Sequence, residues 1–379
     1  MKARSQHAGL LCSVLALGVC ISGVAFAQDS GIAPGSEKPM YKVLKPSLHQ
    51  AQNQSQALGQ AKVLPAATPL QTWNGSFSFS GTTYNYNMVG TKPSSNTTAT
   101  IATIVIPVKI VITSRSGVKT TFDPNSVPSN TNGKTAVANT VASPIFASSV
   151  NFTSGGQSMG TTQYIDAYQR ANFWGTGDTG SHLRLGGPTV ASTVTLSPPT
   201  RSGTTGVVFG FTAGLVDINW FDSQLHTIMT NMGIQPNTFP IFLTYNVYLT
   251  QNRSCCIGGY HSSTGSVSAP QSYAHATYVS RVGAFAQDVS ALSHEVGEWA
   301  DDPLVVNVNG NNTPCGILEN GDPLENNSNF GDFPYTAGGF TYNLQDLVTL
   351  PYFGAPPSTS VNGEFTFHGE GLTVCQNGA

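Results

Sequence analysis

Charged side chains are scarce in this sequence. Asp, Glu, Lys and Arg make up 9% of its 379 residues, and the formal net charge is −3. Without an excess of basic residues the chain lacks the electrostatic footprint of a nucleic-acid-binding protein, so we expect no nucleic-acid partner. The 40 Gly residues, together with abundant Ser, Thr and Asn, favour a β-rich extracellular protein with polar loops.

Long hydrophobic runs are also missing beyond the N-terminus. The nearest candidate, residues 100–113, is interrupted by Pro107 and Lys109 and predicts a β-strand rather than a membrane span. We therefore expect no stable membrane insertion of the mature chain.

The N-terminus has the three parts of a secretory signal peptide. Lys2 and Arg4 form a basic start, residues 10–24 are apolar, and an Ala-Phe-Ala cleavage pattern ends at Ala27. Lipoprotein processing at Cys20 is the less favoured alternative, because a bulky Val precedes that cysteine. The sequence predicts a secreted or periplasmic protein, whose formal net charge after cleavage is −5.

Cysteine is rare, and four cysteines remain after cleavage: Cys255, Cys256, Cys315 and Cys375. In an oxidising compartment this even number predicts two disulfide bonds, with three possible pairings. We expect Cys255 and Cys256 each to reach Cys315 or Cys375. A bridge between the two adjacent cysteines is the alternative.

We expect a signal peptide at 1–27, a disordered leader or propeptide at 28–70, and one β-rich domain at 71–379, with a metal region at about 255–325. The leader is rich in Gln, Ala, Lys and Pro and has no steady periodicity. Within the domain, hydrophobic periodicity predicts a hairpin at 73–88, strands at 101–112, 241–249 and 272–279, and helices at 163–173 and 217–232.

A further helix is predicted from Asp288 to Asp301, because its residues have helical spacing and a proline follows closely. His294 and Glu298 are four residues apart and lie one turn apart on the face opposite the apolar residues. Two donors at this spacing can bind the same ion. Glu295, next to the first donor, would then hold a water on the metal.

An ordinary amphipathic helix with a solvated charged face is the alternative. Against it, five of the 19 acidic residues lie between Asp288 and Asp302. A second acidic group follows at Glu319, Asp322 and Glu325. Such clustering in a nearly uncharged chain favours a metal site.

Several stretches carry a resemblance to a known group of proteins: SHEVGEW at 293–299, DP at 302–303 and GILENGD at 316–322 in the metal region, and residues 163–174, 259–261 and 344–347 outside its core. They resemble exported bacterial proteins that look like variant zincins and pair H-E-x-x-E with a downstream E-x-x-D. The resemblance extends from about residue 73 to the C-terminus. Glu319, 25 residues after His294, is similar in placement to the third ligand of gluzincin metallopeptidases.

The resemblance implies an α+β fold, with a zincin-like metal-binding domain and a β-rich N-terminal portion. It also implies a divalent metal, zinc before others, held by His294, Glu298 and Glu319. Zincin peptidases have His where this chain has Glu298. The additional carboxylate would make the ion less electrophilic and would admit Mn²⁺ or Ca²⁺ more readily.

Two further residues complete the predicted site. His261 lies in a Gly-rich stretch that predicts a loop, from which it could enter the cleft as an oxyanion donor or ligand, or stay a plain loop histidine. We place Asp322 with the metal residues, where it could fix the tautomer of His294; a turn-forming role is the alternative.

The sequence therefore predicts a secreted metal-dependent hydrolase, a zinc metallopeptidase in which Glu295 is the general base and His261 assists. Its partner would be a peptide or extracellular polymer substrate. The alternative is a secreted binding or adhesion protein with a structural or vestigial metal site. Glu298 supports the binding protein, and Glu295 supports the enzyme, because a structural site needs no base.

Overall fold

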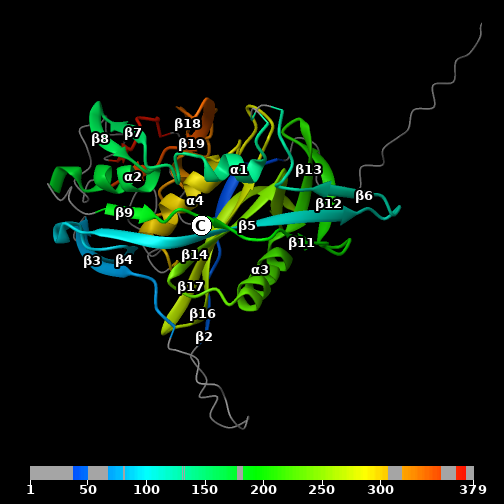
Figure 1. Ribbon diagram of the computed structural model, residues 1–379, viewed down its shortest axis with the longest axis horizontal. Coiled ribbons are helices and arrows are strands. Elements are labelled where there is room, and N and C mark those ends of the chain that lie inside the picture. The colour runs from blue at the N-terminus through cyan, green and yellow to red at the C-terminus, as the bar shows by residue number, and fades with distance from the viewer. Residues whose placement is uncertain are drawn as a thin grey trace, which may run out of the picture.

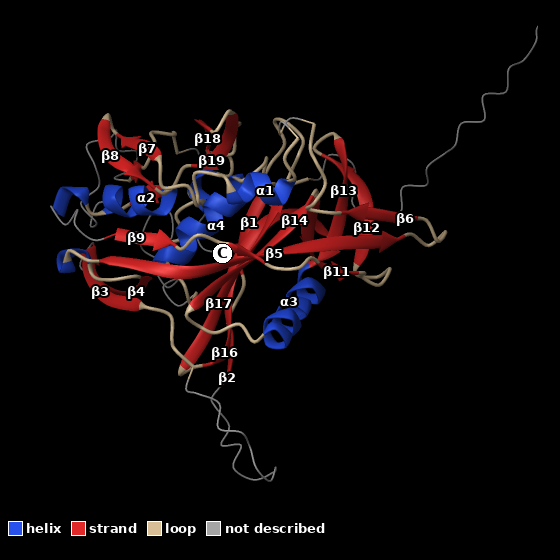
Figure 2. Cartoon of the chain, in the orientation of Figure 1, coloured by secondary structure: helices blue, strands red, loops and turns tan. Residues whose placement is uncertain are grey.

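Strands dominate the molecule (Figures 1 and 2). The computed structural model describes residues 37–49, 67–79, 82–129, 131, 133–176, 182–305, 318–350 and 364–372. Within these residues, thirteen strands form one mixed sheet that nearly closes on itself. The expected zincin-like α+β fold is therefore wrong, because strands that form a nearly closed, barrel-like sheet, and not a zincin-like combination of helices and strands, make up most of the regular structure.

The central path of the sheet has eight strands. In spatial order they are β10 (Thr189–Val190), β5 (Thr98–Thr113), β14 (Thr238–Tyr245), β17 (Ala269–Tyr278), β16 (Ser254–Ser266), β15 (Val247–Gln251), β13 (Phe211–Asp217) and β12 (Gly203–Val208). Five more strands pair with this path: β1 (Met40–Val43) and β2 (Ser47–His49) with β16, and β6 (Lys119–Phe122), β9 (His182–Leu185) and β11 (Val194–Leu196) with β5.

Four separate two-stranded sheets lie outside it. They are β3 (Thr72–Phe79) with β4 (Thr82–Val89), β7 (Val150–Ser154) with β8 (Gln157–Thr162), β18 (Asp332–Ala337) with β19 (Phe340–Gln345), and β20 (Val348–Thr349) with β21 (Phe365–Thr366). The helices are α1 (Ala136–Val141), α2 (Tyr164–Asn172), α3 (Ile218–Met232) and α4 (Ser290–Asp301), with short 3-10 turns η1 (Pro93–Ser95), η2 (Trp174–Thr176) and η3 (Asp322–Leu324).

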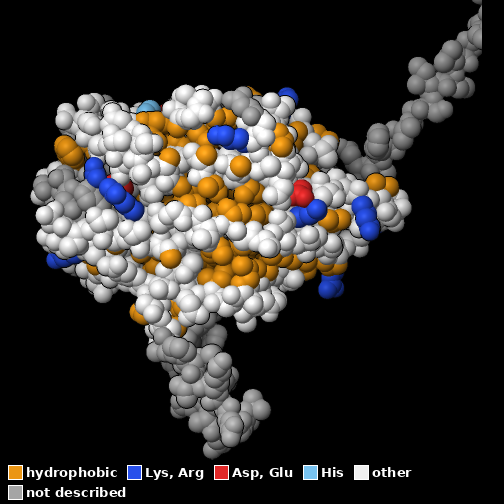
Figure 3. Space-filling model, viewed as in Figure 1, with side chains coloured by type: hydrophobic (Ala, Val, Ile, Leu, Met, Phe, Trp, Pro, Cys, Tyr) orange, Lys and Arg blue, Asp and Glu red, His pale blue; other side chains and the backbone are white. Residues whose placement is uncertain are grey.

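The sheet separates two hydrophobic cores. Alternation along β5 sends Val105 into the core shared with α2 and α4, and Ile106 into the core shared with α3. Helix α4 packs against β16 and β17. On the face shown in Figure 3, hydrophobic side chains gather in the middle and charged ones are few. The low charge of the sequence thus leaves the burial of apolar surface as the main source of stability.

Most of the predicted elements are confirmed. The hairpin is β3 and β4, and helix α3 begins after Asp217, whose carboxylate accepts a hydrogen bond from the Trp220 amide at 2.9 Å. It ends at Gly233, whose φ of 63° suits glycine. The predicted strand 241–249 is instead two strands, because Asn246 has a φ of 53° and interrupts the extended backbone.

The N-terminal part of the chain differs from the expected disordered leader. Within the predicted leader at 28–70, residues 37–49 form β1 and β2, which pair in parallel with β16. The predicted signal peptide, residues 1–27, lies outside the described residues. Among the helices that the structure describes, none is long and apolar enough to cross a membrane.

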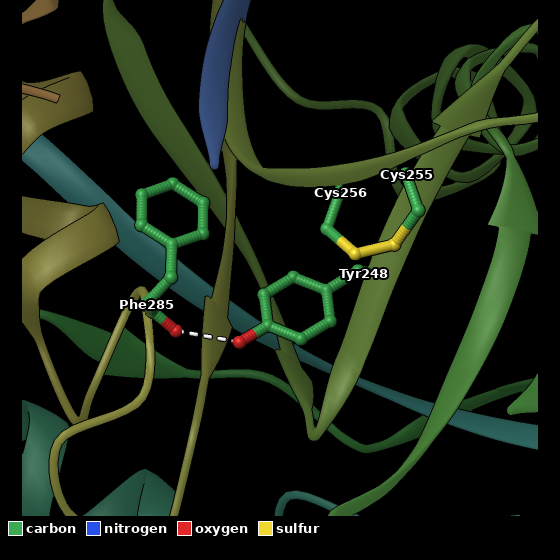
Figure 4. The surroundings of a disulfide bond; sticks show 4 residues. All are labelled: Tyr248, Cys255, Cys256 and Phe285. Carbon is green, nitrogen blue, oxygen red and sulfur yellow. Dashed lines mark hydrogen bonds between the residues drawn. A yellow bond between two sulfur atoms is a disulfide. The ribbon is translucent and has the colours of Figure 1, made fainter. Parts of the chain in front are cut away.

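The adjacent cysteines lie at the start of β16. Figure 4 draws a bond between the sulfur atoms of Cys255 and Cys256, beside the hydrogen bond that Tyr248 donates to the carbonyl of Phe285 at 2.6 Å. The two sulfurs thus face each other and not a more distant cysteine. The favoured partners, Cys315 and Cys375, lie outside the described residues, and oxidation of the cysteines stays a prediction.

Candidate metal centre

Helix α4 is buried along its whole length, so the alternative of a solvated charged face is wrong. On its apolar side, the Trp299 ring stacks on Phe239 with centroids 3.8 Å apart, and its Nε1–H donates to Ser272 Oγ at 3.0 Å. The helix begins one residue later than expected, because Val289, not Asp288, is the N-cap. These contacts fix the orientation of the opposite face, which carries the predicted ligands.

His294 directs its Nε2 atom at two carboxylates. Nε2 lies 3.0 Å from Oε2 of Glu298 and 3.6 Å from Oδ1 of Asp322. The other ring nitrogen, Nδ1, makes a short hydrogen bond to Oε1 of Gln345. The Gln345 amide is oriented because its Nε2 donates to the carbonyl of Phe330 at 2.8 Å. Nδ1 therefore carries the proton, and the lone pair of Nε2 is left for a cation.

Glu298 is held from the opposite side by the backbone. Its Oε1 accepts a hydrogen bond from the amide of Gly321 at 3.0 Å, which leaves Oε2 for His294. A Cβ atom on Gly321 would collide with the His294 ring and would lie 2.6 Å from Oε1 of Gln345. Glycine is thus the residue that lets the downstream segment approach the helix this closely.

His261 lies in strand β16, not in a loop as predicted. Its Nε2 lies 3.2 Å from the carbonyl of Asp302, which can only accept, so Nε2 carries the proton. Nδ1 then faces Oε2 of Glu295 at 3.3 Å and Oε2 of Glu298 at 3.8 Å. Across the strand, a Cβ on Gly259 would lie 2.6 Å from Oε1 of Glu295, so this glycine leaves room for the carboxylate.

The structure thus brings together five of the predicted residues in two overlapping groups. His294, Glu298 and Asp322 form one, and His261, Glu295 and Glu298 form the other. Within each group, one ligand atom per residue lies within 4.8 Å of the others, and every member is buried. These buried groups could hold a metal ion.

Glu319, predicted as the third ligand, belongs to neither group. It lies beside Glu298, and burial followed by the charges of Glu298 and Asp302 raises its pKa well above the usual range. No described residue donates a hydrogen bond to either of its carboxylate oxygens. Asp322 therefore lies nearer than Glu319 to the predicted ligand His294. Glu319 lies beside Glu298, next to the two groups.

The cluster contains one stabilised charge pair and several further carboxyl groups. Against the effect of burial, the charge of Glu298 raises the pKa of His294 and the charge of His294 lowers the pKa of Glu298. Burial raises the pKa of Glu295 well above its usual range, and the charges of Glu298 and Asp322 raise it further. Burial, followed by the charge of Glu298, raises the pKa of Asp322 to about 8. Burial lowers the pKa of His261 to about 4, so this imidazole is neutral near pH 7 and offsets no charge.

A divalent cation fits this arrangement. Oε1 of Glu295 and Oδ1 of Asp322 are buried without a hydrogen-bond partner among the described residues. A buried carboxylate without a partner costs several kcal/mol, which either a proton or a cation must offset. Imidazole nitrogen and carboxylate oxygen together suit Zn²⁺, and a carboxylate-rich set also suits Mn²⁺.

Two residues of the site were missed by sequence reasoning. Gln345 fixes the tautomer of His294, a role that the sequence offered for Asp322. Tyr41 lies in the predicted leader, yet its ring stacks on His294 with centroids 3.8 Å apart. Nothing in the local sequence pairs either residue with the helix, because 51 residues separate Gln345 from His294 and more than 200 separate Tyr41 from it.

Comparisons with protein-family models, characterised proteins and solved structures find no match. The resemblance to variant zincins thus stays a prediction from the motifs.

Proposed function

We propose that this protein is an exported, metal-dependent hydrolase that cleaves peptide bonds. The observation that carries the proposal is the buried convergence of His294, Glu298 and Asp322, with Glu295 and His261 directly beside them. A structural site needs only ligands, whereas this cluster adds a carboxylate with a raised pKa next to the ligand set. Groups with strongly shifted pKa values are typical of acid–base catalysis.

In this proposal, Nε2 of His294 and the carboxylates of Glu298 and Asp322 hold the ion, with Glu319 available as a further carboxylate. When bound, a zinc ion supplies a Lewis acid that polarises the scissile carbonyl and acidifies water. With a cation beside it, whose charge lowers the pKa of this carboxyl group, Glu295 would be ionised, would accept the proton of the attacking water and would later donate it to the leaving amine.

His261 positions Glu295 in this scheme. Because its Nε2 is tied to the Asp302 carbonyl, its Nδ1 presents a lone pair to the Glu295 carboxyl group. The protonated form of Glu295 can donate a hydrogen bond to this lone pair, and the ionised form cannot. His261 thus stabilises the protonated state that follows proton abstraction.

The second candidate is a secreted binding protein with a structural metal site. One observation favours it: His261, His294 and Glu295 are completely buried, and Glu298 is 1% exposed. A catalytic metal keeps one coordination position for water or substrate, whereas a structural metal is closed by protein ligands. The two candidates therefore differ in whether anything can reach the ion.

Metal analysis of the purified mature protein, coupled to a peptide-library cleavage assay, tests the proposal. We expect about one equivalent of divalent metal, with cleavage that a chelator abolishes and added Zn²⁺ or Mn²⁺ restores. Bound metal without cleavage of any library member would leave the structural site as the better account. The absence of stoichiometric metal would refute both candidates.

A further inference from the structure

The N-terminal segment, residues 37–49, occupies one whole edge of β16. Ile257 pairs with Leu249 of β15 and also with Met40 of the segment. Farther along, Tyr260 pairs with His275 of β17 and also with Lys42. A strand has two edges, so β15 and β17 share one of them and the segment covers the other. Figures 1 and 2 show this N-terminal strand beside α4.

The segment is held mainly through its backbone. The Lys38 amide donates to the carbonyl of Cys255 at 2.9 Å, and the Cys256 amide donates to the carbonyl of Lys38 at 2.7 Å. Farther along, the hydroxyl of Ser262 donates to the carbonyl of Leu44 at 3.0 Å. Main-chain hydrogen bonds of this kind accept many sequences. The edge of β16 is thus suited to bind an extended peptide.

One side chain of the segment reaches the metal cluster. The ring of Tyr41 is 3% exposed, stacks on His294 and lies 4.8 Å from the ring centroid of Phe285. Its backbone amide donates to the carboxylate of Glu325, and its hydroxyl lies 3.3 Å from Oγ of Ser290. An aromatic side chain therefore fits a defined position directly over a proposed metal ligand.

Gly258 of β16 lies against the Tyr41 ring. A Cβ atom on Gly258 would lie 3.1 Å from Cε1 of Tyr41 and 3.0 Å from the Phe285 ring. A Cβ atom at this position would therefore crowd the Tyr41 ring, the Phe285 ring and the Ala286 side chain. Glycine at 258 thus lets the aromatic ring approach the strand.

We propose that this edge of β16 is the peptide-binding site of the metal centre. The site binds an extended peptide strand that places an aromatic residue over His294. Residues 37–49 occupy the site as an intramolecular inhibitor. The inference deepens the proposed function by naming a substrate class, and it rests on that function wherever cleavage is concerned. It also explains the complete burial of His294, because the segment lies between His294 and any added peptide.

Competition by the segment can be measured without any catalysis. The probe is a fluorescein-labelled synthetic peptide with the sequence of residues 37–49, and its binding to the full-length mature chain is followed by fluorescence anisotropy. In the wild type, the internal strand competes at an effective concentration on the order of 1 mM. Tyr41→Ala removes the ring that anchors this strand, so we expect that variant to bind the probe at least tenfold more tightly than the wild type.

Three matched variants complete the experiment. Tyr41→Phe keeps the stacked ring and should bind the probe as weakly as the wild type, and so should Lys45→Ala, which changes an exposed side chain. Lys38→Pro removes the segment's own amide that donates to the Cys255 carbonyl, while the probe keeps its amide, and should strengthen probe binding by about fivefold, the equivalent of one hydrogen bond. A probe that carries Ala in place of Tyr41 should bind none of the variants.

The outcomes separate the two proposals. If folded Tyr41→Ala and Lys38→Pro both bind the probe no better than the wild type, the inference is overturned, whether or not the protein cleaves peptides. If Tyr41→Ala does not fold, the result with Lys38→Pro alone decides. If the probe binds as expected but no peptide is cleaved, the binding site stands and the hydrolase proposal fails.

Discussion

Gln345 should control metal affinity without touching the metal. Its Oε1 accepts the hydrogen bond from Nδ1 of His294, and its Nε2 donates to Phe330, so the amide fixes both the tautomer and the orientation of the imidazole. Gln345→Met keeps the approximate volume and removes both hydrogen bonds. Loss of such an outer partner lowers metal affinity by about 10- to 100-fold, or about 1.4–2.7 kcal/mol.

The affinity is measured by competition with a chelator of known zinc affinity, at constant pH. Gln271→Met is the matched control. The Gln271 side chain is also a largely buried amide, and it donates a hydrogen bond to the carbonyl of Thr238 at 2.9 Å. It makes no described contact with the proposed metal-binding residues. Both variants lose a hydrogen bond to a carbonyl, so a general loss of stability affects them alike. Zinc affinity of Gln345→Met within twofold of the wild type would refute the assigned role.

Three further predictions concern the surroundings of the site. Gly321→Ala should destabilise the protein by about 1–3 kcal/mol in chemical unfolding, because the added Cβ atom would meet a filled space. Gly371→Ala is the control and should not destabilise the protein, because no atom lies within 4 Å of the added Cβ. Equal effects of the two substitutions would contradict this packing argument. Asp322→Ala should lower zinc affinity more than Glu319→Ala in the same titration, and the reverse order would exchange their roles. Burial raises the pKa of Asp288 to about 7, so the stability that this carboxyl group contributes is complete below about pH 4 and is lost as the pH rises to about 7. Asp288→Asn should therefore make the free energy of unfolding less dependent on pH between about pH 4 and pH 7. A pH profile equal to that of the wild type would contradict this prediction.

The helix and its ligand spacing could be predicted because they depend on local sequence. Hydrophobic periodicity located α4 to within two residues, and the i, i+4 spacing placed His294 and Glu298 together. Burial of the polar face could not be predicted in the same way. It results from packing against β16 and β19, which are distant in the sequence.

The remaining errors share one cause: long-range strand pairing. His261 was expected in a loop because glycines surround it, yet the same glycines form part of β16 and leave room for Glu295 and Tyr41. Residues 37–49 have no periodicity of their own, and their two strands pair with β16, which is distant in the sequence. The zincin-like fold was inferred from motifs of a few residues, which do not specify how many strands surround them.

The central claim is that Glu295 acts on the proton of water and does not hold the metal. Glu295→Gln keeps the shape of the side chain and removes the charge that accepts a proton, and Glu370→Gln is the control at a carboxylate that lies outside both candidate metal groups. Zinc content and peptide cleavage are measured on the same preparations of both variants and the wild type. The account predicts full zinc occupancy in Glu295→Gln with cleavage reduced by about 10²-fold or more, and wild-type values in the control. Cleavage by Glu295→Gln at the wild-type rate, or loss of its zinc, would contradict the claim.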